Sequence, residues 1–396
     1  MMDSDGLVSD CVPSVDHPIV LAGYPARYPD VYHKVRVLMG DMAVHIDFGG
    51  GEEPVIFVRN IEIARTKEQN PSARIYSPED YAPAGGLSSN RNMGFAQAAG
   101  EFLKREGVKR VTSNQLFPLL FVDVFRESGI EVICDRVLGI AERRAKDQWE
   151  IEQLAEAQRV TEEAISHAYG IIRDAEVRDG FLVHEGEVLT SERLRSEITL
   201  FLLHLGFAND DSIVAGGVSG SNCHFAGSGG LRINEPIIID VFPMSRESRY
   251  SGDCTRTICR GEISDVLREM HEVVVEAKAA SIAACVAGNT GAAVHGASVD
   301  IFLKRGYHIG MPSAGDGDDI IYYPHGTGHG VGLETHEPPI LDEKNHEPLV
   351  VGDALTIEPG LYCKSIGGIR VEDMVIVEDG GCRNLNRLPE GLWWGG

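Results

Sequence analysis

HGTGHGVGLETHEPP, residues 325–339, places His325, His329 and His336 within twelve positions. The stretch also has glycine at positions 326, 328, 330 and 332. A helix is disfavoured, because each interior glycine costs roughly 1 kcal/mol relative to alanine. The pattern instead predicts a strand or loop whose backbone a ligand or another strand can approach closely. In a strand, His325 and His329 share one face and His336 faces the other, unless a bulge intervenes. The alternative is a glycine-rich turn with incidental histidines.

Four acidic residues lie in strand-like, otherwise apolar runs elsewhere in the chain. Asp240 follows three isoleucines, Asp253 precedes CTRTI, Glu358 lies in LTIEPGLY and Glu372 lies in GGIRVEDMVIV. An ionised carboxylate in such surroundings is costly unless it is paired or bound to a metal. One such acid could be a buried carboxylate whose hydrogen bonds are satisfied within the core. Four such acids together with His329 instead indicate that all five side chains bind a common cation. Oxygen and nitrogen ligands suit hard or intermediate cations better than a thiolate-type site does.

The ordered set Asp240, Asp253, His329, Glu358 and Glu372 resembles the metal ligands of the pita-bread metallopeptidases. That superfamily includes methionine aminopeptidase, aminopeptidase P, prolidase and the metal-free creatinase. The resemblance implies two divalent metal ions, one bound by Asp240 and the other by His329 and Glu358, with Asp253 and Glu372 bridging them. Mn(II) is the expected metal, and Co(II), Fe(II) and Zn(II) are the alternatives.

The resemblance also implies which other residues serve the reaction. Glu358 would handle the proton of the nucleophile, and His336 would contact the scissile amide. His224, in SNCHFAGSG, would be a further catalytic residue that also lines the substrate pocket. His325 and Arg370 match further substrate-binding positions whose roles are less defined. Without the resemblance, the simpler interpretation of His224 is a core histidine with satisfied nitrogens.

The sequence departs from the usual family pattern in two places. Asp240 and Asp253 are separated by a longer hairpin that contains PMSRESRYSG, and its tip can reshape the pocket. Pro339-Ile340 stands where many microbial prolidases have an arginine that grips the free carboxylate of a dipeptide. Strict dipeptide specificity is therefore in doubt, unless another cation substitutes: Lys344, His346 or Arg370.

Composition limits the class of protein. A chain of 396 residues, 43% hydrophobic and 24% charged, is typical of a globular protein with two domains. The net charge of −24 disfavours nucleic acid and anionic membranes as partners. We expect no membrane span, because no apolar run reaches about 18 residues, and no signal peptide, because MMDSDGLVSD is acidic. Eight cysteines without CxxC pairs indicate free thiols in a reducing, cytoplasmic compartment.

Two domains of different architecture are predicted. Residues 1–145 alternate strands and helices as in an α/β domain, after an irregular, proline-rich segment that reaches residue 30. One helix is predicted from Asn90 to Glu106, because its apolar residues recur at helical spacing and Gly107 follows as a stop. In that domain His33, His45 and Asp47 are expected to be surface or capping residues. Residues 146–396 are predicted to be α+β, with helices on one side of an antiparallel sheet. The resemblance identifies the two as a smaller creatinase-type domain and a pita-bread catalytic domain.

Three helices are predicted for the second domain from their apolar spacing and capping residues. The first is a charged helix over residues 141–170, which opens the domain. The others run from Ser191 to Leu205 and from Ser264 to Val286, with the two serines as N-caps.

The implied function is that of a metal-dependent exopeptidase, an Xaa-Pro aminopeptidase or dipeptidase. It would cleave a peptide after an N-terminal residue that is followed by proline, using a hydroxide that two metal ions activate. The alternatives are a creatinase-like hydrolase of a non-peptide C–N bond and a non-catalytic pita-bread binding module. Retention of all five ligand-type residues weighs against both. By the same resemblance we expect a homodimer, in which the N-terminal domain walls the active site of the neighbouring subunit.

Overall fold

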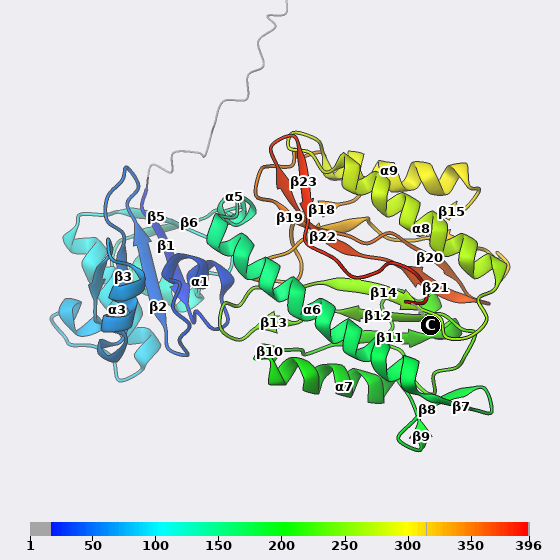
Figure 1. Ribbon diagram of the computed structural model, residues 1–396. Coiled ribbons are helices and arrows are strands. Elements are labelled where there is room, and N and C mark those ends of the chain that lie inside the picture. Colours follow the sequence, from blue (N-terminus) through cyan, green and yellow to red (C-terminus); the bar gives the residue numbers. More distant parts are fainter. Residues whose placement is uncertain (1–16, 314, 395–396) are drawn as a thin grey trace, which may run out of the picture. The chain divides into compact units, whose positions relative to one another are not determined.

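The computed structural model describes residues 17–313 and 315–394 (Figure 1). The chain divides into two compact units between Ala141 and Glu142, a few residues before the predicted boundary. That the two units are independent domains stays a prediction. The stretch MMDSDGLVSD and Cys11 lie outside the described residues, so the expectation about a signal peptide stays untested.

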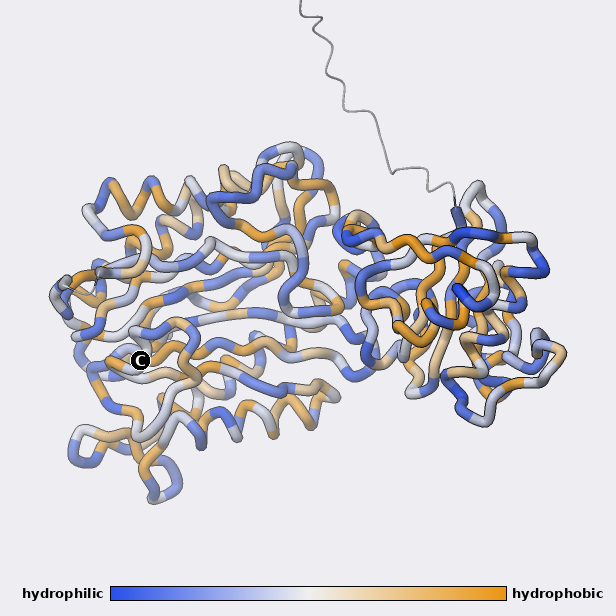
Figure 2. Tube along the Cα trace, turned by 180° about the vertical axis from the view of Figure 1, so that it is seen from behind, coloured by the Kyte–Doolittle hydropathy of each residue, from blue (hydrophilic) through white to orange (hydrophobic). Residues whose placement is uncertain are grey.

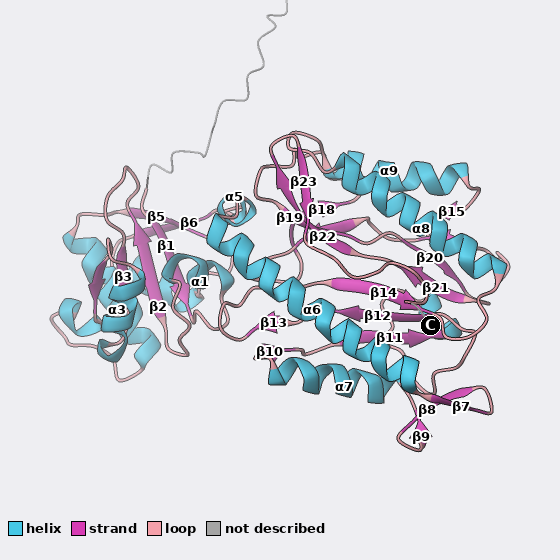
Figure 3. Cartoon of the chain, in the orientation of Figure 1, coloured by secondary structure: helices cyan, strands magenta, loops and turns pink. Residues whose placement is uncertain are grey.

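The first unit has the α/β architecture that the sequence predicts. Its six-stranded mixed sheet has the order β4-β3-β2-β1-β5-β6 (Figure 3). The strands are β1 (Ile19–Gly23), β2 (Ala43–Asp47), β3 (Val55–Phe57), β4 (Arg74–Tyr76), β5 (Arg110–Ser113) and β6 (Glu131–Cys134). The helical elements are α1 (Pro29–Val35), η1 (Asn60–Glu62), α2 (Ile63–Gln69), η2 (Pro78–Tyr81), α3 (Arg91–Arg105) and α4 (Leu119–Glu127).

The core of this unit forms where α3 and α4 cover the apolar strands, which Figure 2 shows in orange. Asn90 starts α3 by accepting a hydrogen bond from the backbone N–H of Met93, as an N-cap residue should. From α3, Phe95, Phe102 and Leu103 are fully buried or nearly so against the sheet. Their spacing on one helix face is what allowed this helix to be predicted.

Two expectations for the first unit are wrong. The segment before residue 30 is not irregular throughout, because β1 pairs with β2 on one side and β5 on the other. Pro18 and Pro25 flank β1 instead of interrupting it, so their missing N–H groups do not break the ladder. His45 is not at the surface either: it is 4% exposed within β2, and burial lowers its pKa to about 4.

The second unit is α+β, as predicted. Its helical elements are α6 (Gln148–Asp174), α7 (Ser191–His204), η3 (Gly217–Ser221), α8 (Asp265–Ala284) and α9 (Gly291–Lys304), preceded by the short α5 (Ile140–Arg144). The earlier strands are β7 (Glu176–Arg178), β8 (Phe181–His184), β9 (Glu187–Val188), β10 (Phe207–Ala208), β11 (Ser212–Gly216), β12 (Ile237–Val241), β13 (Met244–Ser245) and β14 (Cys254–Ile258). The later strands are β15 (His308–Ile309), β16 (Tyr322–Tyr323), β17 (Gly328–Gly330), β18 (Glu337–Leu341), β19 (Ala354–Ile357), β20 (Gly360–Cys363), β21 (Gly367–Arg370), β22 (Asp373–Glu378) and β23 (Gly381–Asn384).

Three sheets of this unit carry the residues of interest, where the sequence predicts a single sheet. Their orders are β11-β12-β14, β15-β16-β20-β21 and β18-β17-β19-β22-β23. The sheets separate because the chain leaves the third for the second after Ile357 and returns after Arg370. Helices α6 and α7 pack on the first sheet, and α8 and α9 pack on the other two (Figure 1).

The predicted helices need three corrections. The charged segment 141–170 is not one helix. Helix α5 ends at Arg144, and α6 starts after Asp147, which caps it and forms a capping box with Glu150. Thr190 and not Ser191 caps α7, whereas Ser264 caps α8 as predicted. Helix α9 was not foreseen, since its two glycines obscure its helical pattern. Within the described residues, no helix is long and apolar enough to cross a membrane.

Candidate metal centre

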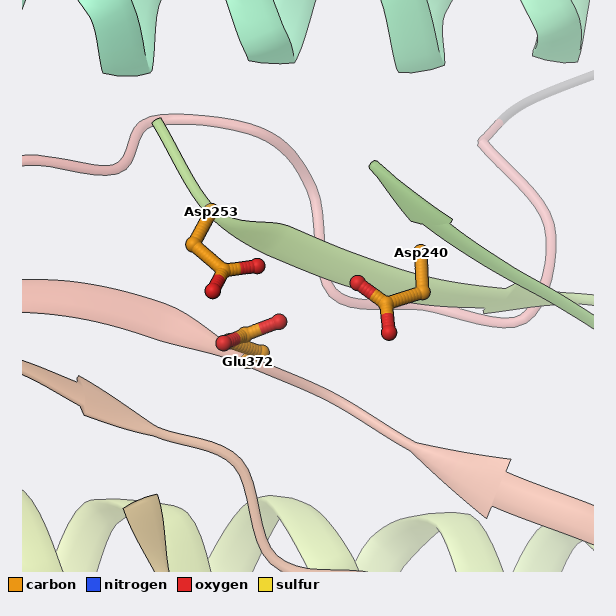
Figure 4. A group of neighbouring side chains, drawn as sticks. All are labelled: Asp240, Asp253 and Glu372. Carbon is orange, nitrogen blue, oxygen red and sulfur yellow. The ribbon is translucent and has the colours of Figure 1, made fainter. Parts of the chain in front are cut away.

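Two neighbouring strands bring the first two acidic residues together. Asp240 lies in β12, and Asp253 immediately precedes β14, which pairs antiparallel with β12. Glu372 approaches from the other side, where the hydroxyl of Thr255 donates a 2.7 Å hydrogen bond to its Oε2. One carboxylate oxygen each from Asp240, Asp253 and Glu372 lies within 4.8 Å of the others (Figure 4). The longer hairpin therefore returns Asp253 to Asp240.

Glu358 and Glu372 occupy the two points at which the chain changes sheets. Glu358 lies between β19 and β20, and Glu372 lies between β21 and β22. Strand β19 pairs with β22, and β20 pairs with β21, so the two breaks are adjacent. The sequence predicts that these acids lie inside continuous strands. In the structure they lie between strands of two different sheets, and both line the same cavity.

His329 completes the group from β17. Its Nε2 is 3.3 Å from Oε1 of Glu358 and 3.8 Å from Oδ2 of Asp253. Its Nδ1 bonds the carbonyl oxygen of Gly330 at 3.0 Å, which can only accept, so Nδ1 carries the hydrogen. In the metal-free site, burial opposes protonation of the ring, but the hydrogen bond from Nε2 to Glu358 prevails and raises the pKa of His329. Once Nε2 gives up its proton, it presents a lone pair toward the acids, as a metal-ligating histidine does.

The glycines around His329 have the role that their spacing predicts. A Cβ at Gly328 would overlap the carbonyl oxygen of Thr356 in β19, so only glycine allows this approach. The ladder between β17 and β18 shifts register between His329 and Gly330, which is a bulge. The three histidines do not share one strand, because His325 precedes β17 and His336 precedes β18. The chain reverses between these antiparallel strands, and the ring of His336 lies 4.2 Å, centre to centre, from that of His329.

The electrostatics of the group favour a cation. Burial and repulsion between neighbouring carboxylates raise the pKa values of Asp253 and Glu372 well above their usual range. Burial opposes ionisation of Glu358 as well, but its hydrogen bond with His329 prevails and lowers its pKa to about 2. Buried Oδ1 of Asp240 has no hydrogen-bond partner within residues 17–313 and 315–394. This orphaned oxygen, beside two acids that resist ionisation, fits the divalent ions that the sequence implies.

Arg370 is fully engaged inside the protein. Its Nη2 donates to Oδ2 of Asp240 at 2.6 Å, its Nη1 to the hydroxyl of Tyr362 at 2.9 Å and its Nε to Thr255 at 3.2 Å. It is 3% exposed. The arginine thus fixes the orientation of Asp240. This leaves it poorly placed to grip a substrate carboxylate, one of the roles that the sequence leaves open.

His325 belongs to the same hydrogen-bonded chain. Its Nδ1 donates a hydrogen bond to the carbonyl oxygen of Gly326 at 2.7 Å. The other nitrogen, Nε2, therefore accepts a hydrogen bond from the hydroxyl group of Tyr362 at 2.9 Å. Burial lowers the pKa of His325 to about 4, which keeps the ring neutral. Sequence reasoning missed Tyr362 and Thr255, because both stand in apolar strand-like runs without a distinguishing pattern.

A cavity of about 390 Å³ joins these residues. All nine residues that the sequence singles out line it: His224, Asp240, Asp253, His325, His329, His336, Glu358, Arg370 and Glu372. Apolar side chains complete the wall: Ile213, Ala226, Phe242 and Ile340. Asp211 and Cys223 also line it and had not been foreseen. The structure brings the predicted residues together, while their individual roles stay predictions. Lys344 and His346 are exposed and are not among the described residues that line the cavity.

Comparison with known proteins agrees with this arrangement. Residues 152–379 match the model of metallopeptidase family M24. The chain is 26% identical over 362 residues to the uncharacterized peptidase YqhT of Bacillus subtilis, covering 90% of this chain and 89% of that one. It is also 26% identical to the Xaa-Pro dipeptidase of Pyrococcus horikoshii, over 81% of this chain and 86% of that one.

A solved structure shows the same fold. The X-Pro aminopeptidase of Thermotoga maritima superposes with a TM-score of 0.76 at 20% identity, covering 95% of this chain and 96% of that one. The family match spans more than half of the chain, which therefore belongs to metallopeptidase family M24. The predicted pita-bread fold and the assignment as a metallopeptidase are both confirmed.

Proposed function

We propose that the protein is an exopeptidase that hydrolyses the Xaa-Pro bond at the N-terminus of a peptide. The observation that carries this proposal is the convergence of five ligand-type side chains and three further histidines on one cavity. Relatives named Xaa-Pro dipeptidase and a structural neighbour named X-Pro aminopeptidase support the choice of bond. Uniformly unpaired cysteines in the described part of the chain support a cytoplasmic location.

Two divalent ions, with Mn(II) the first candidate, fit this donor set. Asp240 would hold one ion, His329 and Glu358 the other, and Asp253 and Glu372 would bridge them. Such ions supply Lewis acidity, which lowers the pKa of water and polarises a carbonyl group. Ligands that are all oxygen or imidazole nitrogen suit Mn(II), Co(II), Fe(II) or Zn(II).

The protein's own side chains divide the remaining work. Glu358, which is ionised in the metal-free site, would accept the proton of the attacking water and pass it to the departing proline nitrogen. His336 would donate a hydrogen bond to the scissile carbonyl as negative charge develops there. Its pKa is lowered by burial and by neighbouring His329, so it acts as a neutral donor. The chain from Arg370 through Tyr362 to His325 holds this side of the cavity rigid.

The cavity favours extended peptides over dipeptides. Of the described residues that line it, only Arg370 carries a guanidinium or ammonium group, and that group is bonded to Asp240 and Tyr362. By the family resemblance, Pro339-Ile340 stands where an arginine would meet a dipeptide carboxylate, and Ile340, which lines the cavity, is 44% exposed. A buried carboxylate without a cationic partner is strongly disfavoured, whereas an extended peptide presents a neutral amide there.

The test is a metal-reconstituted assay with a matched Xaa-Pro dipeptide, an Xaa-Pro tripeptide and creatine. We expect chelation to abolish hydrolysis, Mn(II) or Co(II) to restore it, and kcat/KM for the tripeptide to equal or exceed that for the dipeptide. The variant Ile340→Arg should shift the preference toward the dipeptide, and Ile340→Gln serves as its uncharged control. Full activity after exhaustive chelation, or turnover of creatine alone, would refute the proposal. A dipeptide preference that Arg370→Ala removes, with metal still bound, would identify Arg370 as the anchor.

A further inference from the structure

We propose that Gln158 and Asn386 form a side-chain amide clamp that sets the distance between the bridging carboxylates of Asp253 and Glu372. This inference rests on the proposed metal centre and assigns positioning roles to two residues outside the cavity. Gln158 lies in the middle of α6 and is 0% exposed. Asn386 follows β23 in the C-terminal segment and is half-buried.

Gln158 holds both backbone groups of Asp253. Its Nε2 donates to the carbonyl oxygen of Asp253 at 2.7 Å, and its Oε1 accepts from the backbone N–H of Asp253 at 2.8 Å. Asp253 stands just before β14, so these two groups need partners from outside the strand. A side-chain amide that satisfies both groups fixes the position and the direction of the backbone on both sides of Asp253.

Asn386 extends the clamp to the strand that follows Glu372. Its Oδ1 accepts from Nε2 of Gln158 at 3.0 Å and from the backbone N–H of Met374 at 2.7 Å. Its Nδ2 contacts Sγ of Cys254 at 3.3 Å. One amide oxygen thus joins the segment of Asp253 to β22, two residues after Glu372. A third tie runs directly, from the backbone N–H of Glu372 to the carbonyl oxygen of Thr255 at 3.1 Å.

The metal centre needs such a device because its acids repel one another. Asp240, Asp253 and Glu372 place oxygens within 4.8 Å, in a buried site where repulsion is weakly screened. Asp253 precedes β14 and Glu372 precedes β22, so any separation of these two strands would move the two carboxylates apart and would have to be reversed each time metal binds. The clamp opposes the separation through neutral amides, which add no charge of their own. The clamp therefore reduces the movement of β14 and β22 that metal binding requires.

The test compares Co(II) affinity among full-length variants, by calorimetry and by the visible absorption of the bound ion. Gln158→Met keeps the length of the side chain but removes all of its hydrogen bonds. Asn386→Leu removes the shared acceptor, whereas Asn386→Asp retains an oxygen at that position. We expect Gln158→Met and Asn386→Leu to weaken Co(II) binding by about 10- to 100-fold, as the loss of ligand-supporting contacts typically does. Asn386→Asp should bind Co(II) more tightly than Asn386→Leu.

Ser281→Ala provides the matched control for a general loss of stability. Ser281 is buried in α8, where its hydroxyl bonds the carbonyl oxygen of Val294 and contacts Ser298, away from the metal centre. It should lower the melting temperature of the metal-free protein without changing Co(II) affinity. The double variant Gln158→Met with Asn386→Leu should lose less affinity than the two single losses combined, because both break one network. Unchanged Co(II) affinity in correctly folded Gln158→Met or Asn386→Leu would overturn the clamp.

Hydrogen exchange on the wild-type protein gives a result even if the variants fail to fold. In the metal-free protein, the amide protons of Asp253 and Met374 should be protected as strongly as those inside β14. Rapid exchange at Asp253, with the hydrogen-bonded amides inside β14 still protected, would overturn the inference. A wild-type protein that binds no Co(II) would instead refute the proposed function, so the two failures are distinguishable.

Discussion

His336 differs from the five ligand-type residues in its surroundings. It precedes β18, it is exposed at the mouth of the cavity, and its ring packs against that of His329. Asp240, Asp253, His329 and Glu372 are each less than 10% exposed. This contrast is consistent with the proposed roles, in which His336 meets the substrate and the ligand-type residues hold the ions.

Replacing His336 by alanine should therefore affect turnover but not metal content. Loss of one preorganised donor to a developing oxyanion typically costs about 100- to 1000-fold in kcat. Metal content by emission spectroscopy and kcat on a proline-containing tripeptide are the two measurements. As the matched comparison, His329→Ala should lose metal. Loss of metal in His336→Ala would show that His336 is a ligand.

His45 makes the stability of the first unit depend on pH. Its pKa is lowered by burial to about 4, against about 6.5 in an unfolded chain. Between these values the unfolded state binds more protons, so stability is complete above pH 6.5 and falls as the pH falls toward 4. The expected loss is about 3 kcal/mol over that window. Its Nδ1 has no hydrogen-bond partner in the described part of the chain, so an apolar replacement is tolerable.

The variant His45→Leu should remove this dependence. Urea unfolding of the wild type at pH 7 and pH 5 should show a lower free energy of unfolding at pH 5. The difference should be much smaller in His45→Leu. An equal loss in both proteins would mean that other groups, such as the carboxylates of the metal centre, control stability in this range.

At the scale of elements, β22 is anchored by ion pairs on the side away from the cavity. Asp373 pairs with Arg256 of β14 and with Lys278 of α8, and all three side chains are at most 3% exposed. Lys278 also bonds Glu390 at 2.6 Å, which ties the C-terminal segment to α8. The pKa of Asp373 is lowered because these two cations outweigh its burial. The network holds the strand that begins just after Glu372.

Removing the carboxylate of Asp373 should lower the stability of the protein strongly. Asp373→Leu leaves the buried Arg256 without its carboxylate partner and leaves Lys278 with Glu390 alone, and breaking a buried pair in this way costs about 3–5 kcal/mol. The control is Glu378→Gln at the far end of the same strand, where an exposed pair with Arg383 should contribute less than about 1 kcal/mol. Thermal unfolding of the two variants measures the contrast. Similar small losses in both would show that Arg256 and Lys278 find other partners.

The sequence predicts those elements that are marked by a pattern of neighbouring residues. Helix α3 has one apolar face and a cap, and the ligand-type residues stand out because acids are rare in apolar runs. Sequence reasoning missed features that depend on tertiary contacts. Strand β1 is short and lies between prolines, α9 contains glycines, and the sheet changes at Glu358 and Glu372 have no local signature. Gln158 and Asn386 are ordinary polar residues until the fold places them beside Asp253 and Met374.

At the scale of the whole molecule, the cavity-lining residues all come from the second unit, whereas the first unit exposes large apolar side chains. Every described residue that lines the cavity falls between Asp211 and Glu372. The first unit supplies none of them. It does expose large apolar side chains: Leu119 is 70% exposed, Val137 66% and Leu116 51%. Its edge strand β6 also leaves Ile133 open to solvent, and an uncovered edge strand invites pairing or burial by another chain.

These features, together with the family resemblance, predict a homodimer with twofold symmetry that forms through the first unit. Light scattering at micromolar concentration should give twice the 43.1 kDa mass of one chain. Leu119→Glu places a charge on the exposed apolar surface of the first unit and should shift the protein toward the monomer. Leu303→Glu, in α9 at 57% exposure, is the matched control and should leave the dimer intact. A wild-type monomer would contradict the prediction. A dimer that Leu303→Glu disrupts and Leu119→Glu does not would place the interface on the second unit instead.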